Sequence, residues 1–236
     1  MKNLIEVILC GSSGRMGREI ISAVSDRNDF VISSGVDVVR NECCCFDTYE
    51  TIFDVERPAD VIIDFSSNTS LDMLLEYGVR EHIPIVLCTT GYSREQVEKI
   101  RMTSSKIPIF YSSNMSLGVN LLIELSKIAT KVLGTASDIC IIEKHHKYKK
   151  DSPSGTALML DEAIRSVKDK KVDINSVRAG NIVGEHEVLF VSNNEIVTLK
   201  HSAASKEIFA NGALNAAKFL IDKENGLYDM NCLLFS

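Results

Sequence analysis

The chain has 236 residues, of which 45% are hydrophobic and 25% charged, and its formal net charge is −6. This length suffices for one large domain or two modest ones that fold without disulfides or a structural metal. The excess of acidic residues argues against binding along nucleic acid, and the apolar runs are far shorter than the roughly 20 residues of a membrane helix. We therefore expect a globular enzyme whose partners include neither nucleic acid nor a membrane.

The seven cysteines are odd in number and lack the paired C-x-x-C spacing of a zinc site. We therefore expect free, reduced thiols and no bound metal. No basic segment followed by a long apolar stretch opens the chain, so we expect no secretory signal and a cytoplasmic protein. The adjacent Cys43, Cys44 and Cys45 form either a redox or metal feature or a tolerated loop, and the loop is favoured because three adjacent thiols cannot all face one ion.

The first half of the chain alternates short β-rich runs with helical patterns, as a parallel sheet with crossover helices does. Apolar runs such as Val61, Ile62 and Ile63 fit strands that are buried on both faces. Ser93 with Gln96 three residues later is a capping-box pattern at a helix start. The expected strands are residues 4–10, 30–36, 61–65, 85–88 and 107–111, and the expected helices are residues 15–25, 70–81 and 94–104.

The pattern changes after residue 114, with a long helix expected over 118–133 and a strand over 139–143. Strands at 187–191 and 196–200 flank a turn that contains Asn193 and Asn194, and Asn tolerates positive φ in tight turns, so a hairpin is expected. A last helix at 213–220 should return to the first domain. The fold class is therefore α/β, a Rossmann-type doubly wound parallel sheet with a second, smaller α+β domain. The expected divisions are residues 1–114, 115–209 and 210–236.

A glycine-rich loop follows the first strand and opens the first helix, with Gly11, Gly14 and Gly17 at G-x-x-G-x-x-G spacing. A backbone without Cβ can approach a pyrophosphate, and a helix N-terminus offers unpaired N–H groups to it. The spacing differs from the strict G-x-G-x-x-G, so a mere tight turn remains the alternative. Asp37 ends the second strand, where a carboxylate can accept hydrogen bonds from an adenosine ribose; an ordinary exposed acid in a turn is the other interpretation.

Two polar loops follow later strands of the same sheet. Thr89 and Thr90 follow the fourth strand, and Ser112, Ser113 and Asn114 follow the fifth. Open α/β sheets bind ligands at the carboxyl ends of their strands, so both loops are candidate nicotinamide and ribose contacts. Each could equally be an ordinary loop cap.

The most informative stretch is rich in His and Lys and leads into a helix start, EKHHKYKKDSPSGTAL at residues 143–158. Ser154, Gly155 and Thr156 place backbone N–H groups and two hydroxyls where an anion could bind. With His146 and Lys149 they would form a dicarboxylate pocket, since charge-assisted hydrogen bonds are the strong ones. The alternative is a solvated, Lys-rich loop capped by Ser154.

In order along the chain, the motifs resemble those of the dihydrodipicolinate reductase family, and they span nearly its whole length. The H-H-x-x-K-x-D-x-P-S-G-T-A-L block is the most specific of them. The segments that carry the resemblance are residues 11–17, 61–66 (VIIDFS), 88–93 (CTTGYS), 113–120 (SNMSLGVN), 145–158, 178–188 (RAGNIVGEHEV) and 205–214 (SKEIFANGAL).

The resemblance implies NADH- or NADPH-dependent reduction of 4-hydroxy-tetrahydrodipicolinate to tetrahydrodipicolinate in lysine and diaminopimelate biosynthesis. It implies a homotetramer formed through the sheet of the second domain, and closure between domains. His145 would be the general acid/base and Lys149 the second proton donor, and the substrate would be bound by His146, Ser154, Gly155 and Thr156. The residues implied for the dinucleotide are Gly11, Ser12, Ser13, Gly14, Arg15, Met16, Asp37, Cys88, Thr89, Thr90, Ser112, Ser113, Asn114 and Met115.

The chain departs from the family pattern at two positions, where Cys88 replaces a common Gly and Lys206 a common Arg. We assign no catalytic role to Arg178, Gly184 or His186, which fit packing of the second domain. Asp37 should favour NADH over NADPH because a carboxylate repels a 2′-phosphate, although Arg40 could partly offset it. Two other functions remain open: another Rossmann dehydrogenase, which would not explain the His-Lys block, and a dinucleotide-sensing protein without turnover.

Overall fold

The computed structural model describes residues 4–39, 45–57 and 59–235. Within it the chain forms two compact units. The first comprises the chain through Met115 and again from Glu207 onward, and the second is Ser116–Lys206. Arg40, Cys43 and Cys44, on which part of the sequence analysis rests, lie outside the described residues.

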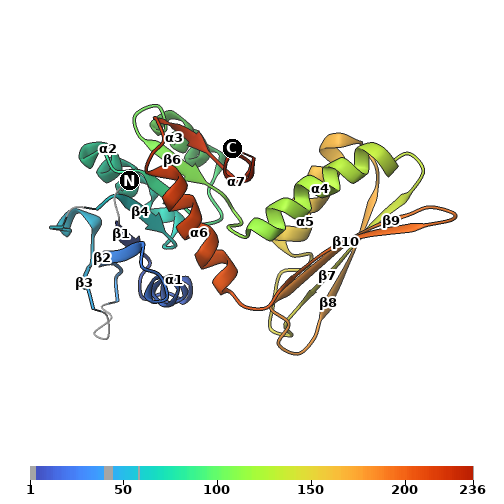
Figure 1. Cartoon of the computed structure of the whole chain (residues 1–236), viewed down its shortest axis with the longest axis horizontal. Coiled ribbons are helices and arrows are strands. Elements are labelled where there is room, and N and C mark those ends of the chain that lie inside the picture. Colours follow the sequence, from blue (N-terminus) through green and yellow to red (C-terminus); the bar gives the residue numbers. More distant parts are fainter. Residues whose placement is uncertain (1–3, 40–44, 58, 236) are drawn as a thin grey trace. The chain divides into compact units, whose positions relative to one another are not determined.

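The first unit is built on a parallel sheet in the order β11-β6-β5-β4-β1-β2-β3 (Figure 1). Without β11 this is the 3-2-1-4-5-6 order of a dinucleotide-binding sheet, with its topological switch point between β1 and β4. The central strands are buried along nearly their whole length, as their apolar runs predicted. The strands are β1 (Ile5–Cys10), β2 (Phe30–Val36), β3 (Asp47–Tyr49), β4 (Val61–Asp64), β5 (Ile85–Leu87), β6 (Pro108–Tyr111) and β11 (Gly226–Tyr228).

Helices cover both faces of this sheet. On one face Leu71 and Leu74 of α2 and Ile100 of α3 pack with sheet residues in one apolar cluster. On the other face α6 packs against α1 and crosses β4, β5 and β6, and its Phe219 meets Phe110 edge to face. The helices are α1 (Arg15–Ser25), α2 (Leu71–Glu81), α3 (Arg94–Thr103), α6 (Glu207–Leu220) and α7 (Met230–Leu234), with 3-10 turns at Ile52–Asp54 and Asn68–Ser70.

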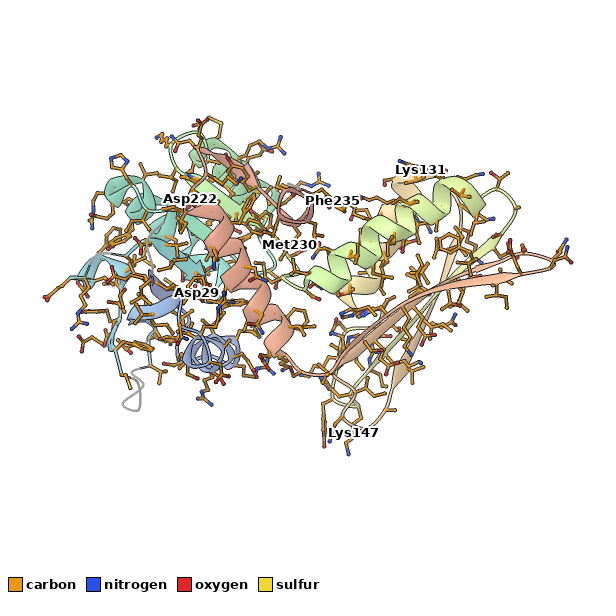
Figure 2. All side chains as sticks on the ribbon, in the orientation of Figure 1. Asp29, Lys131, Lys147, Asp222, Met230 and Phe235 are labelled. Atoms are coloured by element: carbon orange, nitrogen blue, oxygen red, sulfur yellow. The ribbon has the colours of Figure 1, made fainter. Side chains whose placement is uncertain are left out.

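The predicted bounds of most of these elements agree closely with the structure, but the sequence analysis predicted too little secondary structure in the C-terminal part. The capping box of Ser93 and Gln96 is present at the start of α3. Helix α6 begins at Glu207 instead of residue 213. Its Lys218 forms an ion pair of 2.8 Å with Asp29 in the turn before β2, and Asp29 is labelled in Figure 2. β3 and β11, each of three residues, and the short α7 were not expected, because segments this short carry no readable periodicity.

The second unit is a mixed sheet in the order β10-β9-β7-β8, with two helices on one face (Figure 1). β7 pairs parallel with β8 and antiparallel with β9, which pairs antiparallel with β10. The elements are α4 (Leu117–Leu133), β7 (Asp138–His145), α5 (Gly155–Val167), β8 (Val172–Arg178), β9 (Gly184–Val191) and β10 (Ile196–Ala203). The expected fold class, a Rossmann-type parallel sheet with a smaller α+β domain, is confirmed.

The face of the second sheet that α4 and α5 cover changes character along its strands. At one end it is apolar, where Ile141, Val188 and Phe190 pack under the helices. Two to four residues further along β7, the buried positions are Glu143 and His145. The core of this unit therefore ends in a buried polar cluster.

Two expectations about this unit need correction. The hairpin of β9 and β10 is present, but neither Asn193 nor Asn194 has positive φ; the turn is closed by hydrogen bonds between Ser192 and Glu195. β8 was not expected, because its side chains are mostly exposed and polar and carry no apolar signal. No helix in the described part of the chain is long and apolar enough to cross a membrane.

Candidate active site

The glycine loop after β1 lies at the switch point of the first sheet and packs backbone against backbone. Gly11 has a φ of +81°, and a Cβ on it would lie 2.6 Å from the carbonyl oxygen of Phe65, just after β4. A Cβ on Gly17 would lie 2.3 Å from the carbonyl oxygen of Gly11. A side chain at either glycine would clash with neighbouring backbone, so both positions require glycine. The loop that they form is closely packed and lies where such sheets bind dinucleotides.

The start of α1 is open to an anion. Gly14 is the N-cap, no side chain caps the helix, and its first turn holds no acidic residue. The unpaired N–H groups there carry a partial positive charge. Ser12 lies in the same loop, and its buried hydroxyl has no hydrogen-bond partner among the described residues. An uncapped helix start without an acidic residue fits a phosphate, whereas the Ser12 hydroxyl is fully buried against β2.

Asp37, just after β2, ties this loop to the next one. Its two carboxylate oxygens accept hydrogen bonds from the backbone N–H groups of Ser13 and Val39, at 3.0 and 3.1 Å. The carboxylate is half-buried and lines a cavity of about 380 Å³ together with Gly11, Gly14 and Glu50. Each oxygen keeps a lone pair for a further donor, so a ribose hydroxyl could still bind there.

A second cavity of about 590 Å³ lies over the ends of β4, β5 and β6. This volume is within the range of small-molecule sites. Four of the residues predicted to bind the dinucleotide line neither of these two cavities: Ser12, Ser13, Arg15 and Ser112. Arg15 is exposed, and the Ser112 hydroxyl donates to the carbonyl of Asn114 at 2.8 Å. The cavity is lined by Met16, Phe65, Ser66, Ser67, Asn68, Cys88, Thr89, Thr90, Ser113, Asn114, Met115 and Phe209.

Asp64, the last residue of β4, is a buried carboxylate behind this second cavity that the sequence analysis did not single out. It accepts hydrogen bonds from Ser66, through its hydroxyl at 2.5 Å and its N–H at 3.0 Å, and from the Tyr92 hydroxyl at 3.3 Å. Burial raises the pKa of Asp64, and the hydrogen bonds from Ser66 partly offset it. The acidic residue within the apolar VIIDFS run was the available signal.

His145 ends β7 in the second unit, and its imidazole is held by one buried carboxylate. Its Nδ1 lies 2.5 Å from Oε2 of Glu143, two residues earlier on the same face of the strand. Burial lowers the pKa of His145, and Glu143 counteracts this only in part. A Cβ on Gly184 would lie 3.1 Å from Nε2, so the glycine keeps a side chain from crowding the other ring nitrogen.

Glu143 itself is fully buried and bound from several directions. Arg178 donates to both of its oxygens, at 2.9 and 2.7 Å, and the backbone N–H of Ser154 donates to Oε1 at 3.2 Å. Burial would raise the pKa of Glu143, but the side-chain hydrogen bonds from Arg178, Ser176 and His145 outweigh burial and lower it to about 2. The carboxylate is therefore an anion at any working pH.

The start of α5 is anchored next to this carboxylate. The hydroxyl of Ser154 accepts from the N–H of Ala157 at 3.2 Å, which makes Ser154 the N-cap, and it lies 3.0 Å from Nε2 of His186. Burial lowers the pKa of His186 to about 4, so its ring is neutral near pH 7. Gly155 and Thr156 follow in the first turn, and nothing lies within 4 Å of where a Cβ on Gly155 would be.

The cationic side chains of the predicted block do not all behave alike. Lys149 is about one-fifth exposed and pairs with Asp151 at 2.8 Å. His146 is half-buried, and its Nδ1 has no hydrogen-bond partner within the described part of the chain. Lys147 and Lys150 are exposed, and Lys147 lies at the opposite end of this unit from Lys131 on α4 (Figure 2).

The second unit thus collects His145, Lys149, Ser154 and the start of α5 at one end of its sheet. It also brings in Glu143, Arg178, Gly184 and His186, the last three of which the sequence analysis had assigned to packing. Glu143 stands directly before Lys144-His145 in the printed block, but its importance depends on Arg178, which lies 35 residues later on β8.

A dinucleotide-binding sheet joined to a unit with a buried acid–base cluster defines a two-domain oxidoreductase of the nicotinamide type. Two protein-family models together match almost the whole chain. The model for the N-terminus of dihydrodipicolinate reductase matches residues 5–115, and the model for its C-terminus matches residues 118–234. The chain is 42% identical to 4-hydroxy-tetrahydrodipicolinate reductase of Clostridium novyi, over 99% of both chains. It is 38% identical to the enzyme of the same name from Rickettsia bellii, over 96% of this chain and 93% of the relative.

Among solved structures, the fold is similar to the dipicolinate-bound dihydrodipicolinate reductase from Paenisporosarcina sp. TG-14. The TM-score is 0.85 at 20% identity, over 97% of this chain and 99% of that one. This chain belongs to the dihydrodipicolinate reductase family. It is an oxidoreductase with a nucleotide-binding Rossmann domain that uses NAD(P).

Proposed function

We propose that the protein reduces 4-hydroxy-tetrahydrodipicolinate to tetrahydrodipicolinate with NADH or NADPH, as a step of lysine and diaminopimelate biosynthesis. One observation carries the proposal. The anion-accepting start of α5 adjoins a buried Glu143–His145 pair, in a chain that is 42% identical to a reductase named for this substrate. The site thus combines what a cyclic diacid needs: donors for carboxylates and a proton source.

The substrate carboxylates would be bound at the N-terminus of α5. Ser154, Gly155 and Thr156 stand at this helix start, where Ser154 caps the helix through its hydroxyl and the backbone N–H groups of the first turn would face a bound anion. Lys149 and His146 add positive charge and a ring donor from the preceding loop. Charge-assisted hydrogen bonds contribute roughly 1.5–3 kcal/mol each, so a few suffice for a small dianion.

His145 would supply the proton. With Nδ1 directed at the anionic Glu143, Nε2 is the nitrogen that exchanges a proton with the substrate. Lys149 would act as a second donor and offset substrate charge. His145 and Lys149 contribute acid–base chemistry, and bound dihydronicotinamide supplies the hydride.

The dinucleotide would be bound by the first unit. The start of α1, with Gly11, Ser12, Ser13, Gly14, Arg15 and Met16, would hold the phosphates, and Asp37 the adenosine ribose. The larger cavity, with Cys88, Thr89, Thr90, Ser113, Asn114 and Met115, would hold the nicotinamide half, and Ser112 would support it through its bond to Asn114.

We further propose a preference for NADH. A 2′-phosphate at the ribose would meet the carboxylate of Asp37, and Glu50 lines the same cavity. Steady-state kcat/KM values for both cofactors test this, and a tenfold or greater preference for NADPH contradicts it.

The family resemblance also supports a homotetramer that works in the cytoplasm. Five cysteines in the described part of the chain are free thiols, which fits a reducing compartment. Light scattering of the purified protein gives the oligomeric mass, and a monomer at micromolar concentration contradicts the tetramer. Fractionation of the source cells tests the compartment.

The decisive experiment for the activity is a coupled assay. The substrate is made in place by the preceding synthase, and oxidation of NADH is followed at 340 nm. Sustained oxidation that requires both the synthase and this protein is expected. NADH binding without turnover identifies a dinucleotide sensor and contradicts the proposed function.

A further inference from the structure

Glu143 is the point where three separate segments of the second unit meet. Its side chain is fully buried, and it accepts hydrogen bonds from His145 on β7, Arg178 on β8 and the backbone of Ser154 before α5. A buried carboxylate is costly unless it is fully paired, and here each oxygen accepts from at least two donors, with the Ser176 side chain as a further partner. Such an arrangement in a sheet core demands a reason beyond stability, because apolar residues stabilise a core as well or better.

The first effect of Glu143 is on the ring of His145. Because the carboxylate is anionic, it can only accept, so Nδ1 of His145 must carry a hydrogen. The neutral ring is thereby fixed in the tautomer with Nε2 free, and Gly184 leaves space beside that atom. The same negative charge opposes the lowering of the His145 pKa by burial and by the nearby Lys149 and Arg178.

The second effect is on the start of α5. The N–H of Ser154 donates to Oε1 of Glu143, while the Ser154 hydroxyl caps the helix. The same carboxylate therefore sets the distance between the His145 ring and the helix start. The proton donor and the anion site are thus both held by one group.

Arg178 fixes the carboxylate. Its two terminal nitrogens bind the two oxygens of Glu143 in a fork, and one of them also donates to the backbone carbonyl of Asp151 at 2.7 Å. Asp151 in turn pairs with Lys149. The network thus runs from Lys149 through Asp151, Arg178 and Glu143 to His145. It includes two cationic side chains, Lys149 and Arg178.

We propose that Glu143, held by Arg178, is the positioning residue of the candidate site in the second unit: it sets the tautomer and proton affinity of His145 and locks the start of α5. The inference rests on the proposed function, since it assigns a role relative to His145. Neither residue needs to touch the substrate.

The test compares Glu143→Gln with Glu187→Gln. Glu187 is a carboxylate on the adjacent strand β9 that is bonded to Lys144 and Lys200 and has no contact with His145. Both proteins are checked by circular dichroism and for NADH affinity. In Glu143→Gln we expect kcat to fall at least tenfold at pH 7 and NADH affinity to stay within about twofold. The alkaline limb of its kcat–pH profile should move to lower pH. Glu187→Gln should match the parent protein in all three measurements.

A second measurement needs no stable variant at position 143. The ¹⁵N shifts of the His145 ring in the parent protein, assigned by their loss in His145→Gln, report the tautomer of the neutral ring. Protonated Nδ1 supports the proposal. A ring protonated at Nε2, or a folded Glu143→Gln protein with an unchanged pH profile, overturns it. The proposed function fails separately, if the parent protein shows no turnover in the coupled assay.

Discussion

The strand ends of the first unit and the polar end of the second sheet both gather functional side chains, but they do so by different means. In the first unit the loops after β1 and β4 touch through backbone atoms, and the helix start at Gly14 is left uncapped. In the second, a single buried carboxylate collects side chains from β7 and β8 and the start of α5. The first site is therefore shaped mainly by backbone geometry, and the second by charge.

This difference has a consequence for mutational sensitivity. Where the backbone forms the site, adding one methyl group at a glycine is the damaging change. Where buried charges form it, removing one partner leaves another charge unpaired, which is costly in a core. The site in each unit should accordingly respond to different substitutions and in different assays.

The largest effect is expected for His145→Gln. Loss of the proton donor should lower turnover by on the order of 10²- to 10⁴-fold, with little change in NADH affinity. The coupled assay and a fluorescence titration with NADH measure the two quantities. Parent-like turnover would show that the second site is not catalytic.

Lys149→Ala should lower turnover by about 10- to 100-fold and also raise the KM for substrate, because its ammonium faces a dianion. Lys147→Ala and Lys150→Ala are the matched controls, since both side chains are exposed, and they should change either quantity less than about twofold. If all three lysine variants are equally mild, the segment is only a solvated loop.

The stability of the second unit should depend on pH through His186. Its pKa is about 4 in the folded protein and about 6.5 when unfolded. A lowered folded-state pKa means that the stabilisation is complete above pH 6.5 and is lost as pH falls toward 4, on the order of 3 kcal/mol. Thermal unfolding between pH 4.5 and 7 should show a smaller pH dependence in His186→Gln, and an unchanged slope would contradict this.

Gly17→Ala tests the backbone-built site. The added Cβ would lie 2.3 Å from the Gly11 carbonyl oxygen, so the loop must shift, at a cost of about 1–3 kcal/mol. NADH affinity should fall about tenfold in a calorimetric titration. Gly155→Ala is the stability control, because open space surrounds that position, and its melting temperature should stay close to that of the parent protein.

The smallest effect is expected for Asp37→Asn. Loss of the charge should raise kcat/KM for NADPH several-fold, while one side-chain oxygen remains to accept from Ser13 or Val39. The ratio of kcat/KM values for the two cofactors is the measurement. A ratio that does not move would show that Asp37 does not discriminate at the ribose.

The parallel sheet was predictable from the sequence alone, because apolar runs of four to seven residues alternate with helical patterns. The expected strands agree with β1, β2, β4, β5 and β6 to within one residue at each end. Gly11, Asp37 and the start of α5 at Ser154 were also readable, because a turn, a strand end and a helix cap are local features. The short edge strands β3 and β11 and the polar strand β8 were not, because their position depends on a neighbouring strand and not on their own pattern.

The use of Glu143, Arg178 and His186 depends on the tertiary structure. Glu143 and His186 stand in strands of alternating burial and Arg178 ends a mostly exposed strand, and in both kinds of strand a buried polar residue looks the same in the sequence as an exposed one. Strand pairing brings Arg178 beside His145 and His186 beside Glu143, and the return of the chain at α5 adds Ser154. A buried charged residue and the residue that pairs with it lie on different segments of the chain, so no local sequence pattern can reveal the pair.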